Sequence, residues 1–227
     1  MSVYSARFSE SPGPAWNAMI AEWLAGLFMA PVLADVVTSY RVGLAARFLD
    51  LLADEPGCEA GVLRMRSALM TEDPPVTVAR KLAAAFTLLF DGVGGPHTVS
   101  PYESAYVGGS GRLFGSPAAE MDRLLRQSDV STDGAFREPP DHLSIELALL
   151  ARLTRQDAGH QAQAALLDDH LLSWVPNFAD RCGNADPTGF YAGAVGVLTA
   201  FLTAQRASLP VRRHTIPATG VASCRPE

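Results

Sequence analysis

Cysteine is scarce in this chain. Only Cys58, Cys182 and Cys224 occur in 227 residues, and no two of them form a C-x-x-C pair. This wide spacing excludes a disulfide scaffold and a zinc site built from cysteine pairs, and it is typical of a protein kept in a reducing compartment. We interpret Cys58 and Cys182 as small apolar residues of the interior.

Basic charge and long apolar runs are also in short supply. The net charge is -6 at pH 7 and the sequence pI is about 5.4, which argues against nucleic acid as a partner because phosphates demand a basic surface. The apolar run 190–202 contains Gly193 and Gly196 and is too short to cross a bilayer. The first residues lack a charged segment leading into an apolar one, so we expect a cytoplasmic protein.

Patterns that carry chemistry are missing as well. The stretch 92–95 lacks the lysine that completes a phosphate-binding loop, and Arg112 stands where a nucleophile elbow has its second glycine. Five histidines are present and none belongs to a compact metal-binding pattern: His97, His142, His160, His170 and His214. The sequence therefore predicts no catalytic residues, no metal site and a protein that is not an enzyme.

Alanine and leucine, in contrast, recur throughout the chain at helical spacing. Runs of β-branched and aromatic residues are nearly absent, so we predict an all-α fold with a single compact multi-helix domain. The spacing of apolar residues from Trp16 to Phe28 is that of a helix facing a core. The expected helices cover approximately residues 14–30, 32–53 with a bend at Gly43, 59–70, 76–90, 117–127, 142–153, 160–182 with a kink at Pro176, and 186–206.

The ends of the chain and two internal segments do not show this spacing. We expect a loose arm over residues 1–13, an all-helical domain over 14–207, and a flexible tail over 208–227. Residues 91–116 are rich in glycine and contain aromatic residues, so we expect a structured loop of the kind that commonly carries function. Residues 128–137 are expected to be a polar connector.

Two pairs of residues are candidates for binding. Tyr102 and Tyr106 either pack onto the helices or offer an apolar surface with a polar tip. Asp141 is expected to cap a helix beginning at His142, and His142 would lie near the positive end of the helix dipole, which favours a neutral imidazole that bonds a partner. Trp174, at helical spacing from its apolar neighbours, is interpreted as a core residue.

Four segments carry a resemblance to a known family. They are F-T-L-L-F-D-G at 86–92, P-Y-E-S-A-Y at 101–106, E-P-P-D-H-L at 138–143 and H-L-L-S-W-V-P-N-F at 170–178. In this order they resemble the TorD/DmsD chaperones, which assemble molybdenum-containing redox enzymes. The resemblance extends from about Trp16 to Gln205. Each segment alone is a modest signal for the family, but four of them in the same order are a specific one.

The resemblance implies an all-helical chaperone, in some members a domain-swapped dimer. It implies binding of the twin-arginine signal peptide and the apo form of a molybdenum-cofactor oxidoreductase of the DMSO or TMAO reductase type before export. The implied binding surface consists of Leu89, Phe90, Pro101, Tyr102, Ser104, Tyr106, Glu138, Asp141 and His142.

Tyr102 stands where several relatives carry tryptophan, and Ala105 is smaller than the usual valine. Acidic groups such as Glu103, Glu138 and Asp141 are expected to face the arginines of the signal. Two alternatives stay open: an assembly factor for a non-exported enzyme of the nitrate reductase type, and a protein that binds or hydrolyses GTP weakly.

Overall fold

Helices dominate the described part of the chain, which comprises residues 13–107, 115–128, 138–156 and 159–210 of the computed structural model. No strand occurs within these residues, and the only β pairing among them is an isolated bridge between Tyr102 and His142. The all-α prediction is therefore confirmed. The predicted arm up to residue 12, the part of the glycine-rich loop around Arg112, and most of the connector and tail lie outside the described residues.

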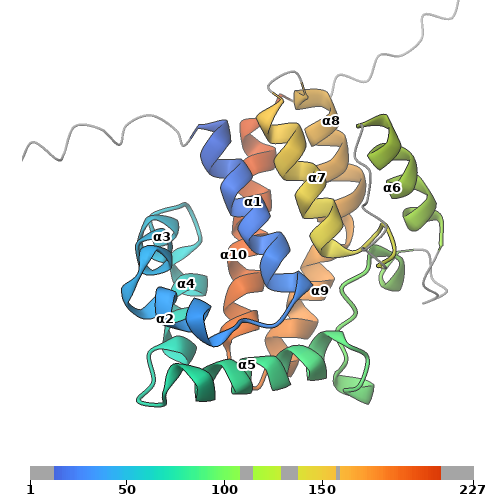
Figure 1. Ribbon diagram of the computed structural model, residues 1–227. Helices are drawn as coiled ribbons and strands as arrows, with labels where there is room; N and C mark the ends of the chain where they lie inside the picture. Colours follow the sequence, from blue (N-terminus) through green and yellow to red (C-terminus); the bar gives the residue numbers. More distant parts are fainter. Residues whose placement is uncertain (1–12, 108–114, 129–137, 157–158, 211–227) are drawn as a thin grey trace, which may run out of the picture.

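The long helices stand side by side around one interior (Figure 1). α1 (Pro14–Met29) packs along α7 (Leu143–Arg155), while α10 (Phe190–Ser208) packs on α4 (Glu59–Leu69) and α9 (Leu172–Ala185). Their apolar faces fill the core with large side chains, which stabilises the fold by removing apolar surface from water. The largest fully buried side chains include Trp174, Tyr191, Phe28, Phe178 and Phe190.

The N-terminal half adds a smaller group of helices beside this bundle (Figure 1). α2 (Ala34–Val42) and α3 (Leu44–Ala53) are separated at Gly43, so the bend expected there is a break between two helices. An added Cβ at Gly43 would lie 3.0 Å from Cα and 3.1 Å from the carbonyl oxygen of Ser39, so a side chain would crowd this corner. α5 (Pro75–Phe90) then crosses below the bundle and leads into the loop that follows.

The backbones of α4 and α10 approach each other closely at two glycines. An added Cβ on Gly61 would lie 2.7 Å from the carbonyl oxygen of Gly193, and one on Gly193 would lie 2.6 Å from that of Gly61. Real Cβ atoms do not tolerate such distances to backbone atoms. Gly193, which interrupts the apolar run of α10, therefore serves helix packing.

The last helix differs from its prediction at both ends. It begins at Phe190 instead of residue 186, because the Asp186 carboxylate accepts hydrogen bonds from the backbone N–H of Thr188 at 2.8 Å and Ala192 at 2.9 Å and so caps the helix from outside. Gly189 turns the chain into the helix with φ 79°. The helix ends at Ser208, two residues beyond its predicted end, and Leu209 is buried.

The helix predicted over 160–182 consists of three parts. α8 (His160–Ala165) passes into a π-helical segment η3 (Leu166–Leu171), and α9 follows directly. Pro176, where a kink is predicted, lies inside α9. The hydrogen-bonding pattern changes one turn earlier, in a wider π-helical turn of the kind often found at functional sites.

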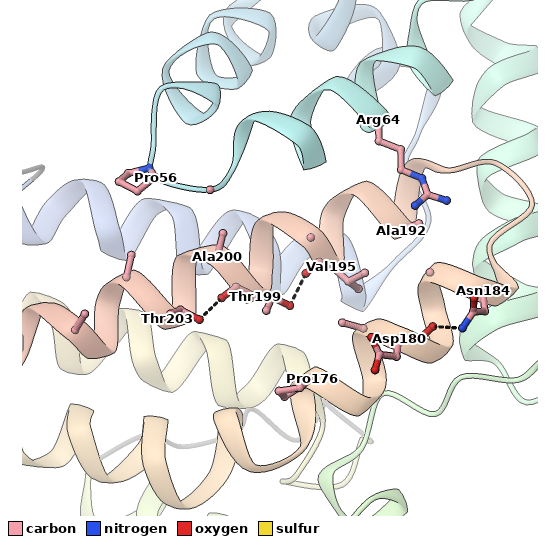
Figure 2. A pocket seen from close by; sticks show the side chains of 16 residues that line it. Pro56, Arg64, Pro176, Asp180, Asn184, Ala192, Val195, Thr199, Ala200 and Thr203 are labelled. Atoms are coloured by element: carbon pink, nitrogen blue, oxygen red, sulfur yellow. Dashed lines mark hydrogen bonds between the residues drawn. The ribbon is translucent and has the colours of Figure 1, made fainter.

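A groove of about 920 Å³ lies between α4, α9 and α10 (Figure 2). Small residues of α10 line much of it, among them Ala192, Gly196, Ala200 and Ala204. None of the nine residues proposed from the sequence lines this groove. Among the described residues, no helix is both long and apolar enough to cross a membrane.

α6 (Ser116–Gln127) completes the fold at one side, against the short 3-10 turn η2 (Glu103–Ala105). A second 3-10 turn, η1 (Gly95–His97), precedes it. The described part of the 91–116 segment is therefore structured, as predicted, and it brings the P-Y-E-S-A-Y residues against the start of α7.

Candidate functional site

Two segments that are distant in sequence meet at the candidate site. We call residues 99–107 the site loop and residues 138–142 the helix-start segment. The Glu103 N–H donates to the carbonyl of Asp141 at 3.0 Å, and the Leu143 N–H donates to that of Pro101 at 2.9 Å. These bonds flank the antiparallel bridge between Tyr102 and His142. The two segments therefore form one backbone-paired unit.

The preceding helix fixes the other end of the site loop. The Val99 N–H donates to the carbonyl of Leu89 at 2.6 Å. Leu89 and Phe90 are themselves buried, and the Phe90 ring contacts those of Phe28 and Tyr191 with centroid distances of 5.9 and 5.3 Å. These two predicted site residues therefore belong to the core and position the loop from beneath.

Asp141 does not cap α7 as expected. The helix begins at Leu143, and the fully buried Asp141 carboxylate accepts a hydrogen bond from the Ser104 N–H at 3.0 Å. Its backbone and side chain together hold η2, because both accept N–H groups of that turn. Asp141 thus fastens the site loop to the helix-start segment.

His142 is the cap residue instead. Its Nδ1 accepts a hydrogen bond from the Ser144 N–H at 3.1 Å, which requires that nitrogen to be unprotonated. Burial lowers the pKa of His142 to about 4, against the opposing charges of Glu138 and Asp141. This geometry agrees with the neutral imidazole predicted from the sequence, with burial as the main cause where the helix dipole was expected.

Only part of the predicted surface faces solvent. Glu138 is exposed and Tyr102 is half-buried, and the Tyr102 hydroxyl donates a hydrogen bond to the Glu138 carboxylate. The Tyr102 ring also meets that of His142 edge-on, with centroids 4.9 Å apart. Burial, followed by the hydrogen bond to Glu138, raises the pKa of Tyr102, which keeps the hydroxyl protonated as a donor.

Tyr106 is engaged with the protein on its ring faces and edge. It stacks on Trp174 at a centroid distance of 5.3 Å and meets Phe178 edge-on at 6.3 Å. The guanidinium of Arg181 lies 5.7 Å from the centre of its ring. The packing interpretation of Tyr106 fits these contacts better than a free binding platform, and Trp174 is a core residue as predicted.

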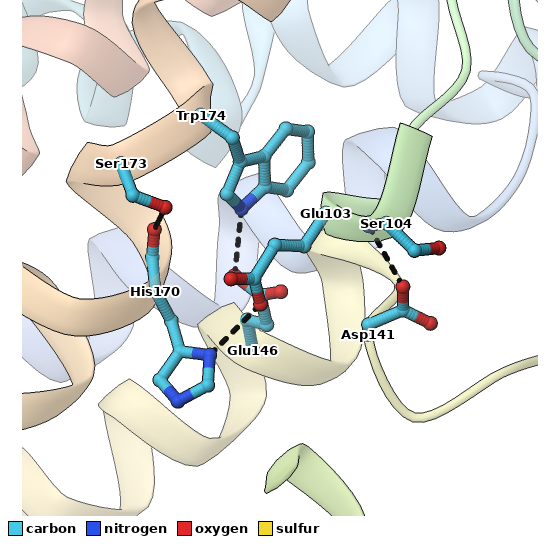
Figure 3. Close-up of polar contacts among 7 residues, drawn as sticks. All are labelled: Glu103, Ser104, Asp141, Glu146, His170, Ser173 and Trp174. Atoms are coloured by element: carbon cyan, nitrogen blue, oxygen red, sulfur yellow. Dashed lines mark hydrogen bonds and ion pairs between the residues drawn. The ribbon is translucent and has the colours of Figure 1, made fainter. Parts of the chain in front are cut away.

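The expectation that Glu103 and Asp141 face a bound peptide is wrong. Both side chains are buried, with 2% and 0% exposure, and Glu103 points into the bundle (Figure 3). Its Oε2 lies 2.8 Å from Nδ1 of His170 on η3. Of the three acids expected to face arginines, only Glu138 remains on the surface.

The interior holds one further acid that sequence reasoning did not select. Glu146 on α7 is fully buried and accepts a hydrogen bond from the Trp174 indole N–H at 3.2 Å (Figure 3). A signal was available, because Glu146, His170 and Trp174 stand at positions that otherwise show apolar helical spacing. We call Glu103, Asp141, Glu146 and His170 the buried acid cluster.

This cluster is not a metal centre. Among the described residues, no group of three or more histidine, cysteine, aspartate or glutamate side chains is arranged to hold a metal ion. The site thus offers backbone-paired segments, an exposed carboxylate beside an aromatic ring, and a neutral imidazole. Such an arrangement is suited to binding a chain that carries basic and apolar groups.

Comparison with known proteins identifies relatives over most of the chain. A family model described as nitrate reductase delta subunit matches residues 53–180. The chaperone protein TorD of Photobacterium profundum is 33% identical over 201 residues, which cover 82% of this chain and 92% of that protein. TorD of Vibrio cholerae is 32% identical over 196 residues, covering 82% and 88%. TorD of Aliivibrio fischeri is 31% identical over 201 residues, covering 83% and 93%.

Proposed function

The chain belongs to the TorD/DmsD family of chaperones, and from this membership we propose that it binds the twin-arginine signal peptide and the apo form of a molybdenum-cofactor oxidoreductase. Its relatives are named as chaperones, and its role is that of a chaperone and not of an enzyme. The client is held in the cytoplasm until its cofactor is inserted and export can begin.

The paired site loop and helix-start segment carry this proposal. Tyr102 and Glu138 come from different segments, yet they lie side by side at the surface and share a hydrogen bond. A carboxylate accepts a guanidinium in a bidentate pair, and the adjacent ring offers apolar contact to the rest of the signal. His142 supports this ring from below.

The expected affinity is moderate. Burying about 500 Å² of apolar surface on a signal peptide gives on the order of 10 kcal/mol before the ordering of the peptide offsets much of it. The balance corresponds to binding in the micromolar range. A chaperone that must release its client for export requires such reversibility.

Calorimetric titration of a twin-arginine signal peptide into the purified protein tests the proposal. We expect saturable binding that weakens about tenfold for Glu138→Gln and for a peptide with both arginines replaced by glutamine, because one charge-assisted pair is lost in each case. Glu72→Gln is the matched control. Glu72 is exposed and lies just before the start of α5, whereas the site loop follows the opposite end of that helix. Binding that is absent in the folded wild-type protein would reject the proposal.

A second candidate is favoured by the description of the matching family model. That model is named for a nitrate reductase subunit, so an assembly factor for a non-exported enzyme of this type is the alternative. Such a factor would bind its client without need of the twin-arginine pair. Equal affinity for the native peptide and for the peptide without arginines favours this alternative, and weak GTP binding stays a separate prediction.

A further inference from the structure

The buried acid cluster contains more carboxyl groups than the surrounding charge can support. Glu103, Asp141 and Glu146 are each at most 2% exposed, and His170 is 4% exposed. If all three carboxyl groups were ionised, one imidazolium would face three negative charges in a medium of low dielectric constant, which is strongly unfavourable. At least one of the acids must therefore keep its proton.

The geometry assigns that proton to Glu146. Its carboxyl group faces that of Glu103, and two carboxylates so close together in the interior repel each other, which favours protonation of one of them. Glu146 Oε2 accepts from the Trp174 N–H, while Oε1 is buried and meets no N–H donor among the described residues. Burial first, and the charge of Glu103 next, raise the pKa of Glu146 well above its ordinary value.

Glu103 pairs with His170 instead, with its Oε2 2.8 Å from the imidazole Nδ1. Burial lowers the pKa of His170, but the hydrogen bond to Glu103 and the charges of Glu103, Glu120 and Asp169 outweigh it, so that the net direction is upward. Glu120 belongs to α6 and Asp169 to η3, which places acidic groups around the imidazole from three elements. The cluster thus contains two hydrogen bonds, one between Trp174 and Glu146 and one between Glu103 and His170, and the carboxyl groups of Glu103 and Glu146 face each other between them.

Glu103 differs from the other members because it belongs to the site loop. Its neighbour Tyr102 is half-buried, while the side chain of Glu103 reaches inward to His170 on η3 (Figure 3). We propose that Glu103, Glu146 and His170 are positioning residues, which hold the site loop in its binding conformation by sharing protons in the interior. The expected effect on peptide binding rests on the proposed function, whereas the expected effect on the order of the site loop does not.

The proposal predicts a direction for the effect of pH. Both Glu146 and His170 have pKa values raised in the folded protein, so both bind more protons folded than unfolded, and their contributions are fully present at low pH and decline as pH rises. Ionisation of Glu146 would place a second negative charge against Glu103, with Asp141 nearby. Loss of the proton from His170 would remove the counter-charge. The site loop should therefore loosen towards alkaline pH.

Two substitutions separate the role of Glu146 from that of Glu103. Glu146→Gln keeps an N–H donor towards Glu103 and an acceptor for Trp174, so it should leave the loop in place and reduce its sensitivity to alkaline pH. Glu103→Gln removes the charge that pairs with His170 and should release the loop. Asp168→Asn is the matched control. Asp168 lies on the same η3 segment as His170, and its substitution removes an ion pair with Arg206 of α10 and not a contact of the site loop.

Hydrogen exchange of the amides in residues 99–107 measures loop order without any client. We expect Glu103→Gln to speed exchange about 100-fold, in line with loss of one partner of a buried pair, and Glu146→Gln and Asp168→Asn to change it less than about threefold. Equal acceleration by Glu146→Gln and Glu103→Gln would show that Glu146 is ionised and would overturn the proposal. Unchanged exchange in Glu103→Gln would overturn it as well.

Infrared spectroscopy of the wild-type protein provides a measurement that does not depend on a folded Glu103 variant. We expect the carbonyl stretch of a protonated carboxylic acid at pH 7, lost on alkaline titration and absent from Glu146→Gln. Its absence from the wild type at pH 7 contradicts the assignment. Measuring the peptide affinity of the same variants distinguishes failure of the loop inference from failure of the proposed function. If the loop responds as expected but the protein binds no signal peptide, only the proposed function is rejected.

Discussion

The neutral, buried His142 should make the protein sensitive to acid. In the unfolded chain this histidine takes up a proton near its ordinary pKa of 6.5, whereas in the folded protein it does so only near pH 4. Because the folded pKa is lowered, its contribution to stability is fully present above pH 6.5 and is lost as pH falls towards 4. The interval between these pKa values is worth about 3 kcal/mol.

Urea unfolding at pH 7 and at pH 4 measures this loss, and two variants isolate it. His142→Asn retains an N-cap acceptor for the Ser144 N–H, so we expect it to stay within about 1 kcal/mol of the wild type at pH 7. It should then lose about 3 kcal/mol less than the wild type between the two pH values. His160→Asn replaces an exposed histidine at the start of α8 and serves as the control.

The comparison between variants is needed because other groups titrate over the same range. Glu146 and His170 have raised pKa values and change stability in the opposite sense, so the wild-type curve alone is a sum. If the wild type and His142→Asn lose the same free energy of unfolding between pH 7 and pH 4, the imidazole is not held neutral by burial. The reasoning about its capping role would then fail too.

Three further changes have expected outcomes. Gly193→Ala should lower the free energy of unfolding by about 2 kcal/mol in urea, because its Cβ meets the α4 backbone, while the exposed Gly26→Ala should raise it by up to about 1 kcal/mol. Asp141→Ala should cost about 1–3 kcal/mol and Asp141→Asn less, since Asn keeps an acceptor for Ser104; equal costs would contradict the hydrogen bond. Burial raises the pKa of Cys58 to about 11, so mass spectrometry should find it unlabelled by a thiol reagent at pH 7 until the protein unfolds.

Helix content could be predicted from the sequence because it depends on local spacing. The apolar positions from Trp16 to Phe28 repeat at helical intervals, and α1 covers them. Helix ends depend on single hydrogen bonds and were less predictable. Nothing in the order Asp141–His142 tells which side chain reaches the N–H of Ser144, and nothing near Asp186 shows that its carboxylate reaches the N–H of Ala192.

The candidate site could be predicted as a set of residues but not as a surface. The resemblance selected both segments that the backbone bonds join, including Tyr102 and Glu138. It did not show that Glu103 faces inward, since a charged residue in a glycine-rich segment is ordinarily exposed. Burial of a carboxylate requires a partner from elsewhere in the chain, and His170 is separated from Glu103 by 67 positions.

The bridge between Tyr102 and His142 joins two points of the chain that are distant in sequence, so the residues between them form a closed loop. The chain leaves this junction after Val107 and returns to it at Glu138, with α6 on the way. A detour that starts and ends at one fastened point can lengthen at low entropic cost, about 0.6 kcal/mol for each doubling of a flexible loop. Insertions on the detour outside α6 should therefore leave the Tyr102–His142 junction intact. The detour, and not the junction, is the natural place to attach a reporter or affinity tag.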